Sequence, residues 1–297
     1  MLDTSALNKR IGYHPQCHFL KLTHLCFADD LLVFTDGRKR SIEEILQIFE
    51  KFAKFSGLRI SLEKSTIYMA GVTENEKDAI LHTFPFESGA LPVRYLGLPL
   101  LTKRMTTSDY TPLLEKIRYR ISKWTARNLS SEGRLQLISS VIQSLTNFWM
   151  SAFRLPSACI KEIDSLCSAF LWSGLELNTK KAKVAWKDVF TPKEEGGLGL
   201  RSLKEVNKAS CLKLFWRMLS SNSLWVKWLR QYLMRKGSFW STNENSSLGS
   251  WMWRKLLKYR ELAAHFVKYE IQSGKQTSFS FDNWSPLGRL IEISGNR

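Results

Sequence analysis

Two short apolar runs around a pair of adjacent aspartates constrain the fold of this chain most strongly. The runs span residues 18–27 and 31–34, and Ala28, Asp29 and Asp30 lie between them. Apolar runs that flank a short polar segment in this way predict a β-hairpin with a carboxylate turn. Two adjacent carboxylates on such a turn can present oxygens to Mg²⁺, although an exposed Asp-Asp turn without a ligand is also common.

The rest of the first hundred residues alternates between helical and extended patterns. Residues 41–44 have the sequence of a capping box, apolar residues follow them at helical spacing, and Gly57 ends the run. A second capping box at residues 73–76 opens another helix. Residues 59–70 and 92–100 have the pattern of extended segments. The first hundred residues therefore predict an α+β unit.

The pattern becomes helical after residue 108. Apolar residues recur at helical spacing in five stretches, residues 114–124, 135–149, 160–172, 203–232 and 251–269. Residues 180–199 are polar and contain a Gly-Gly-Leu-Gly turn. We expect a helical bundle, then a linker at residues 180–199, then further helices.

Positive charge is concentrated in the helical part of the chain. The formal net charge is +17, yet residues 1–100 contain equal numbers of basic and acidic side chains, so the whole excess follows residue 100. All 11 tryptophans follow residue 100 as well. A basic, aromatic-rich part beside a neutral part indicates a surface for a polyanion attached to a more enzyme-like unit. A solvated charged surface over an ordinary helical core would give the same composition.

One helix shows this division of charged and apolar residues most clearly. In residues 113–127 four cations share one face: Lys116, Arg120, Lys123 and Arg127. Four apolar residues share another: Leu114, Ile117, Ile121 and Trp124. We expect the apolar face to pack and the basic face to be free for phosphates, although a basic face that is only solvated has the same pattern.

The cysteines and the apolar runs indicate the redox state and the compartment of the chain. The five cysteines are an odd number scattered over the chain, which favours reduced thiols over a disulfide framework. No apolar run has the length of a signal segment or a membrane span. We expect an intracellular, soluble protein without a membrane partner.

Four segments, in order, resemble parts of the reverse transcriptases of plant non-LTR (LINE-type) retrotransposons. Residues 23–34 resemble the palm hairpin that carries metal-binding aspartates, and residues 57–65 resemble the motif that follows it. Residues 93–98 resemble the strand that grips the primer end. Residues 185–200 are similar to a segment that follows the thumb in plant elements. The resemblance covers the C-terminal part of the polymerase domain.

This resemblance implies roles for individual residues. Asp29 and Asp30 would form the metal turn and bind Mg²⁺, with Asp29 as the first candidate for a direct ligand. Lys64 would donate a proton to the leaving pyrophosphate. The primer-grip strand would include Tyr95, Leu96 and Gly97.

The resemblance also implies an organisation and a function. Residues 1–100 would be the C-terminal part of the palm, residues 101–178 an all-helical thumb, and residues 179–297 a basic, Trp-rich helical tail. The activity would be that of an RNA-directed DNA polymerase, with an RNA template and a DNA primer as partners and the nucleus as its place of action.

One catalytic group of the family has no counterpart in the sequence. The family's further catalytic aspartate lies well upstream of the metal turn, and the one acidic residue before Asp29 is Asp3, which lacks a hydrophobic strand around it. We therefore expect no polymerisation by this chain alone, unless an N-terminal polymerase half is supplied separately. Two alternatives stay open: a non-catalytic, basic nucleic-acid-binding protein derived from such an enzyme, and a decayed reading frame without a selected role.

Overall fold

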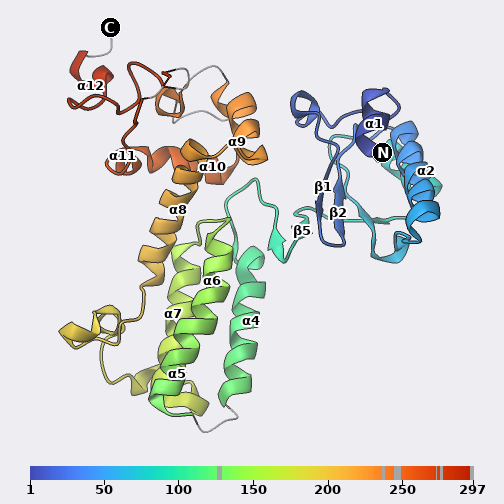
Figure 1. Ribbon diagram of the computed structural model, residues 1–297. Helices are drawn as coiled ribbons and strands as arrows, with labels where there is room; N and C mark the ends of the chain where they lie inside the picture. Colours follow the sequence, from blue (N-terminus) through green and yellow to red (C-terminus); the bar gives the residue numbers. More distant parts are fainter. Residues whose placement is uncertain (126–128, 236–237, 244–248, 272, 275–276, 295–297) are drawn as a thin grey trace. The chain divides into compact units, whose positions relative to one another are not determined.

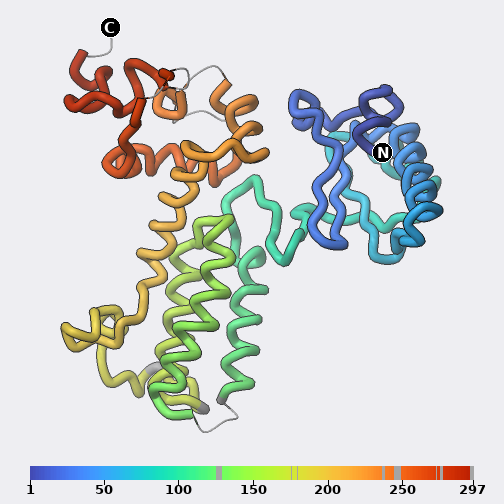
Figure 2. The backbone as a smooth tube through the Cα atoms, viewed as in Figure 1, coloured from blue at the N-terminus to red at the C-terminus, as the bar shows by residue number. Residues whose placement is uncertain are grey.

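The computed structural model describes residues 1–297 except 126–128, 236–237, 244–248, 272, 275–276 and 295–297. The chain divides into two compact units. Unit 1 comprises residues 1–100 and 227–236, and unit 2 comprises residues 101–226 and 237–297. The described residues form a mixed α+β structure that is mostly helical (Figures 1 and 2). They contain three two-stranded sheets.

Unit 1 contains the predicted hairpin and two helices that pack together. Strands β1 (His24–Phe27) and β2 (Asp30–Val33) pair antiparallel, and helices α1 (Leu2–Leu7) and α2 (Lys39–Ser56) accompany them (Figure 1). The side chains that hold α1 against α2 are apolar: Leu2, Ala6, Ile11, Ile45 and Ile48. Burial of these side chains is the main stabilising contribution that the described residues make here.

The first strand is shorter than the sequence predicts. Residues His18–Leu20 form a 3-10 helix, and Lys21 after them has a left-handed φ of 50°. The amide of Leu22 donates to the carbonyl of Cys17 at 3.2 Å, which closes this turn. The apolar run therefore folds back on itself before the strand begins, and its residues before position 24 are not strand.

The capping box expected at residues 41–44 is absent, although its helix is present. Helix α2 begins two residues earlier, at Lys39, and Ser41 is buried within it. The Ser41 hydroxyl accepts a hydrogen bond from the amide of Gly12 at 3.1 Å, and Glu44 accepts one from the Ser5 hydroxyl at 2.6 Å. Both polar groups bind a distant part of the chain, which a local pattern does not reveal.

Two other signals at helix ends are confirmed. Gly57 follows α2 with a φ of 73°, a left-handed conformation in which glycine is favoured. Helix α3 (Glu74–Thr83) begins with a complete capping box, in which the side chain of Thr73 accepts from the amide of Glu76 and the Glu76 side chain accepts from the amide of Thr73.

The remaining strands of unit 1 are two residues long. Strand β3 (Thr66–Ile67) pairs in parallel with β4 (Glu87–Ser88). Strand β5 (Arg94–Tyr95) pairs antiparallel with β6 (Leu98–Pro99). The segment expected to be extended at residues 92–100 is thus a tight hairpin.

Unit 2 is built from helices. Its first part consists of α4 (Thr107–Thr125), α5 (Ser131–Leu137), α6 (Gln143–Met150) and α7 (Ser157–Ser173), with a π-helical stretch, Ile138–Ile142, between α5 and α6. The later helices are α8 (Leu203–Ser220), α9 (Leu224–Leu229), α10 (Trp251–Lys258), α11 (Arg260–Ala264) and α12 (Leu290–Ser294). The last residues of α9, from Lys227, and the π-helix Arg230–Met234 that continues it belong to unit 1. None of the described helices is long and apolar enough to span a bilayer.

The core of unit 2 explains the apolar spacing of its helices. The largest fully buried side chains of this unit are Leu113, Ile117, Ile121, Ile142, Met150, Ile163, Phe170, Leu171, Phe215, Met218 and Leu256. Trp124 packs on Phe170 with ring centroids 5.8 Å apart.

All five cysteines are free thiols, and only Cys26 among them is exposed.

Residues 180–199 are mostly exposed, yet they fold into defined turns within unit 2 and do not separate two units as a linker would. They form short 3-10 turns, and Val189 within them is 1% exposed. The amides of Leu198 and Leu200 both donate to the carbonyl of Val189. A Cβ atom on Gly197 would lie 2.0 Å from the Thr191 carbonyl oxygen, so the packed turn excludes any side chain at that position.

Candidate metal turn and nucleic-acid interface

The hairpin presents the two aspartates at its tip. Phe27 pairs with Asp30, so the loop consists of Ala28 and Asp29 alone. Ala28 has a φ of 51°, and a positive φ at the first loop position is typical of the tight turns that match strand twist. Asp29 and Asp30 are both exposed. Their carboxylates are therefore accessible to a ligand from solvent.

Hydrogen bonds within the hairpin and contacts to helix α1 hold the two ends of strand β1. The thiol of Cys26 donates to the carbonyl of Ala28, with a sulfur-to-oxygen distance of 3.6 Å. At the other end of β1, the buried Thr23 hydroxyl donates to the carboxylate of Asp3, which also lies 3.7 Å from Nδ1 of His24. Asp3 thus joins α1 to β1 and does not belong to the turn.

The donor chemistry of the turn suits a hard cation but does not complete a two-metal site. Carboxylate oxygens are the ligands that Mg²⁺ prefers, and Asp29 and Asp30 supply them. Catalysis by two ions requires a further carboxylate from another element. Within the described part of the chain, no group of three or more His, Cys, Asp or Glu side chains is placed to hold a metal.

The other residues assigned to catalysis and primer binding lie in separate segments. Lys64 ends the 3-10 helix Leu62–Lys64 and is exposed. Leu96 and Gly97 form the two-residue turn between β5 and β6, with φ values of 52° and 79°. Tyr95 precedes them and is half-buried. No atom lies within 4 Å of a Cβ built on Gly97, so its positive φ accounts for glycine there without any ligand. The roles of these residues stay predictions.

Helix α4 divides into two faces as its sequence predicts. Leu114 is 2% exposed, while Ile117 and Ile121 are fully buried. On the opposite face the side chains are exposed: Lys116, Arg120 and Lys123. Lys123 lies over the ring of Tyr119, with Nζ 5.4 Å from the centroid. Arg127, the fourth cation expected on this face, lies outside the described residues.

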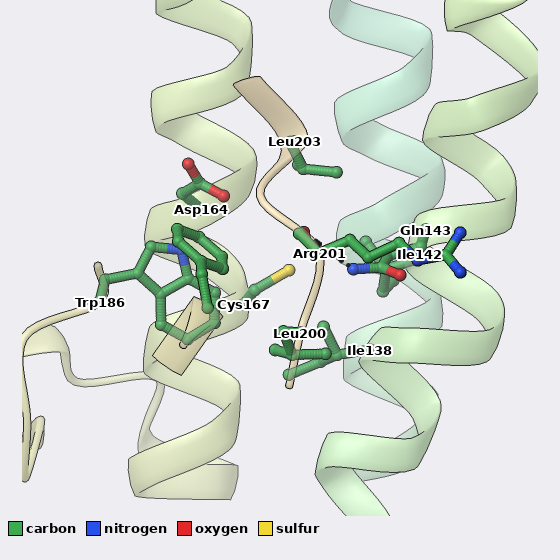
Figure 3. Close-up of a pocket in the computed structure, with 10 residues that line it drawn as sticks. Ile138, Ile142, Gln143, Asp164, Cys167, Trp186, Leu200, Arg201 and Leu203 are labelled. Carbon is green, nitrogen blue, oxygen red and sulfur yellow. Dashed lines mark hydrogen bonds between the residues drawn. The ribbon is translucent and has the colours of Figure 1, made fainter. Parts of the chain in front are cut away.

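The best-formed cavity of unit 2 is not a nucleotide site. Its volume is about 10 Å³, roughly the space of one water molecule, and Ile138, Ile142, Leu200 and Leu203 line it beside Cys167. Figure 3 shows these side chains between helices, with Asp164 and Trp186 at one side. Burial raises the pKa of Asp164, and the neighbouring indole of Trp186 partly opposes that effect. The cavity is a small packing gap where residues of the 180–199 segment contact the helices, and it is too small for a nucleotide.

Reasoning from the sequence overlooked one basic cluster. Arg104, Arg154, Lys255 and Lys258 come from three segments of unit 2, and the charges of the other three all lower the pKa of Lys255. Because the segments are far apart in the chain, no periodic spacing connects them. Only their high local content of basic and aromatic residues could have drawn attention to them.

Comparisons with known proteins found a family model that matches part of the chain, and two relatives. Residues 5–100 match the family model described as reverse transcriptase (RNA-dependent DNA polymerase). A putative ribonuclease H protein of Arabidopsis thaliana is 32% identical over 208 residues, which cover 66% of this chain and 32% of that protein. The chain thus spans less than half the length of that relative.

A second relative is covered almost completely. An uncharacterized mitochondrial protein of Arabidopsis thaliana is 30% identical over 143 residues, which cover 48% of this chain and 92% of that protein. The match of 208 residues to the first relative is longer than the segment 5–100, so the similarity extends into the helical unit. The chain belongs to the same family as this mitochondrial protein, and its residues 5–100 are a domain of the reverse transcriptase family.

Proposed function

We propose that this chain supplies the metal turn and the thumb of a plant non-LTR retrotransposon reverse transcriptase, binds an RNA template with its DNA primer, and does not polymerise by itself. The observation that carries the proposal is the exposed Asp29-Asp30 pair at the tip of a β-hairpin with a two-residue loop, inside a reverse transcriptase domain. In this proposal Asp29 and Asp30 bind Mg²⁺, and Lys64 protonates the leaving pyrophosphate. Tyr95, Leu96 and Gly97 hold the primer end.

The expected lack of polymerisation follows from the number of carboxylates. Two ions need a bridging carboxylate in addition to the turn, and the described residues gather no third acidic ligand there. Asp3, which precedes the turn in sequence, is engaged with Thr23 and His24. In this proposal, a bridging carboxylate has to come from outside the described residues.

Helix α4 supports binding independently of chemistry. Its cations Lys116, Arg120 and Lys123 are exposed on the side opposite the packed face. Contacts of this kind to phosphates are independent of base sequence and weaken steeply with salt. Binding of primer and template can therefore persist where catalysis does not.

Primer extension on an RNA template tests this proposal directly. The purified chain is incubated with Mg²⁺ and nucleotides, and bound primer-template is measured in the same samples. Asp29→Ala is compared with Asp78→Ala, which removes an exposed acid from α3 and serves as the matched control. We expect binding by all three proteins and extension by none. Extension that Asp29→Ala abolishes and Asp78→Ala retains would show that the active site is complete. Absence of binding would contradict the proposal as a whole.

A second candidate function is non-catalytic nucleic-acid binding, which the exposed cations of α4 favour. The two functions differ in what Asp29 does. If the turn still engages a metal with nucleic acid, Mg²⁺ should strengthen primer-template binding in the wild type and in Asp78→Ala but not in Asp29→Ala. Binding that depends on neither Mg²⁺ nor Asp29 would favour the non-catalytic protein.

A further inference from the structure

Three segments of unit 2 meet at the beginning of helix α10. The amide of Trp251, the first residue of α10, donates to the carbonyl of Thr102 at 2.9 Å. Side chains from the three segments line a common small cavity: Leu101, Lys103, Met105, Phe153, Trp251 and Met252. Residues 101–105 and 153–154 are therefore held against α10.

This junction gathers four positive charges. Burial lowers the pKa of Lys255, and the charges of Arg154, Lys258 and Arg104 lower it further, in that order of influence. An effect of one cation on the pKa of another requires that they lie within each other's electrostatic field. Arg104 and Lys258 are exposed, while Arg154 and Lys255 are half-buried.

No acidic group of the described residues balances these charges. Elsewhere in unit 2, Arg118 pairs with Glu162, and Arg289 lies 3.1 Å from a carboxylate oxygen of Glu261. None of the ion pairs that the described residues form includes any of the four cations. Like charges held together without a counterion favour an anion from outside.

Aromatic rings hold two of the cations in place. Nζ of Lys255 lies 5.4 Å from the centroid of the Trp251 ring, and the guanidinium carbon of Arg154 lies 5.2 Å from that of Tyr259. An aromatic face attracts a cation without neutralising its charge. Neither of these contacts pairs Lys255 or Arg154 with an acidic group.

A buried asparagine fixes the segment that carries Arg154. Asn207 of α8 accepts a hydrogen bond from the amide of Leu155 and donates one to the carbonyl of the same residue, both at 3.0 Å. Asn207 is 4% exposed, and these two bonds pair its amide oxygen and its amide nitrogen with one backbone residue. Arg154 therefore directly precedes a residue whose backbone amide and carbonyl are both held by α8.

We propose that Arg104, Arg154, Lys255 and Lys258 form a second nucleic-acid contact, which binds consecutive phosphates of a single strand. The cations match a phosphodiester backbone, and the apolar and aromatic side chains beside them suit unpaired bases better than the outside of a duplex. This contact shares with the proposed function only the class of ligand, a nucleic acid. It uses no residue of the Asp29-Asp30 turn or of helix α4.

Salt-dependent binding of a labelled strand tests this contact. The full chain is titrated with a fluorescein-labelled RNA strand of about 16 nucleotides, a length of the order that single-strand binding folds cover, and anisotropy is read over a range of salt concentrations. The variant Arg154→Gln/Lys255→Gln is compared with Lys181→Gln/Lys183→Gln. The second variant removes the same charge from an exposed segment elsewhere in unit 2.

We expect the slope of log K against log salt, which is negative, to become shallower by about 1.4 in the cluster variant, because each phosphate contact on a single strand contributes about −0.7. The control should leave the slope nearly unchanged. A third variant, Arg154→Lys/Lys255→Arg, keeps both charges and should keep the slope of the wild type. Equal slopes for the cluster variant and the control would overturn this contact. So would equal losses in the charge-keeping and charge-removing variants.

Failure of this contact is distinguishable from failure of the proposed function. The variant Lys116→Gln/Arg120→Gln removes two cations from α4. If it weakens binding while the α10 cluster variant does not, the proposed function stands and the second contact is wrong. If the wild-type chain binds neither the strand nor a primer-template, both are wrong.

Discussion

At the scale of single residues, the Asp29-Asp30 turn depends on an unfavourable backbone conformation. Ala28 has a φ of 51°, in the left-handed region that costs an ordinary L residue about 1 kcal/mol. Replacement of Ala28 by glycine should remove this cost and raise the free energy of unfolding of unit 1 by up to about 1 kcal/mol. Urea unfolding followed by circular dichroism measures the change. The control Ala70→Gly, at an exposed position without a positive φ, should lower stability instead. A loss of equal size in both variants would contradict this account of the turn.

The carboxyl group of Asp164 lies beside Trp186 of the 180–199 segment and has a shifted pKa. Burial raises the pKa of its carboxyl above the usual value of 3.8. A carboxyl whose pKa is higher in the folded than in the unfolded chain costs stability once both states are ionised, and costs nothing once both are protonated. Asp164→Asn should therefore be more stable than the wild type at neutral pH, and the difference should disappear as the pH falls below 3.8. Urea midpoints across this pH range measure the difference. The exposed Asp188→Asn should change stability by less than about 0.5 kcal/mol, and a gain in Asp164→Asn that persists in acid would contradict the prediction.

At the scale of elements, local signals were predictable and distant contacts were not. The left-handed Gly57 and the capping box of Thr73 act within a few residues, and the sequence predicts both correctly. Ser41 has the same local pattern as Thr73, but its hydroxyl binds the amide of Gly12 inside the packed unit. Tertiary contacts of this kind decide which pattern is used, and they are not visible in a window of a few residues.

The candidate site divides in the same way. The Asp29-Asp30 turn and the two faces of α4 follow from runs and spacings within one element, so the sequence predicts where these residues lie. The cluster around Lys255 draws on residues far apart in the chain, and packing alone brings them together. The prediction of a linker at residues 180–199 failed for a related reason. The segment is polar, but its one buried side chain, Val189, anchors it.

The connection between α6 and α7 should depend on one side chain of α8. Asn207 makes two buried hydrogen bonds to Leu155, and their loss leaves a backbone amide and a carbonyl without partners. Asn207→Ala should lower the free energy of unfolding of unit 2 by about 3 kcal/mol. Asn147→Ala, an exposed asparagine on α6, should change it by less than about 0.5 kcal/mol. Chemical denaturation followed by tryptophan fluorescence measures both. Equal effects of the two substitutions would show that the buried pair does not hold this turn.

At the scale of the whole molecule, each unit has buried apolar groups of its own. Ile45 belongs to the cluster between α1 and α2 in unit 1, while Ile163 is fully buried in α7 of unit 2. Two units with separate cores need not unfold in one transition. The tryptophans offer a probe that is nearly specific to one of them, because all except Trp228 lie in unit 2.

Core substitutions in the two units should therefore have separate effects. Ile163→Ala should lower stability by about 2 to 5 kcal/mol and shift the unfolding midpoint read by tryptophan fluorescence. Ile45→Ala should leave that midpoint unchanged. It should move to lower denaturant concentration the part of the circular dichroism transition that fluorescence does not report. If Ile45→Ala instead shifts the fluorescence midpoint as far as Ile163→Ala does, the two units unfold as one cooperative structure, and the reverse transcriptase domain depends on the helical unit for its stability.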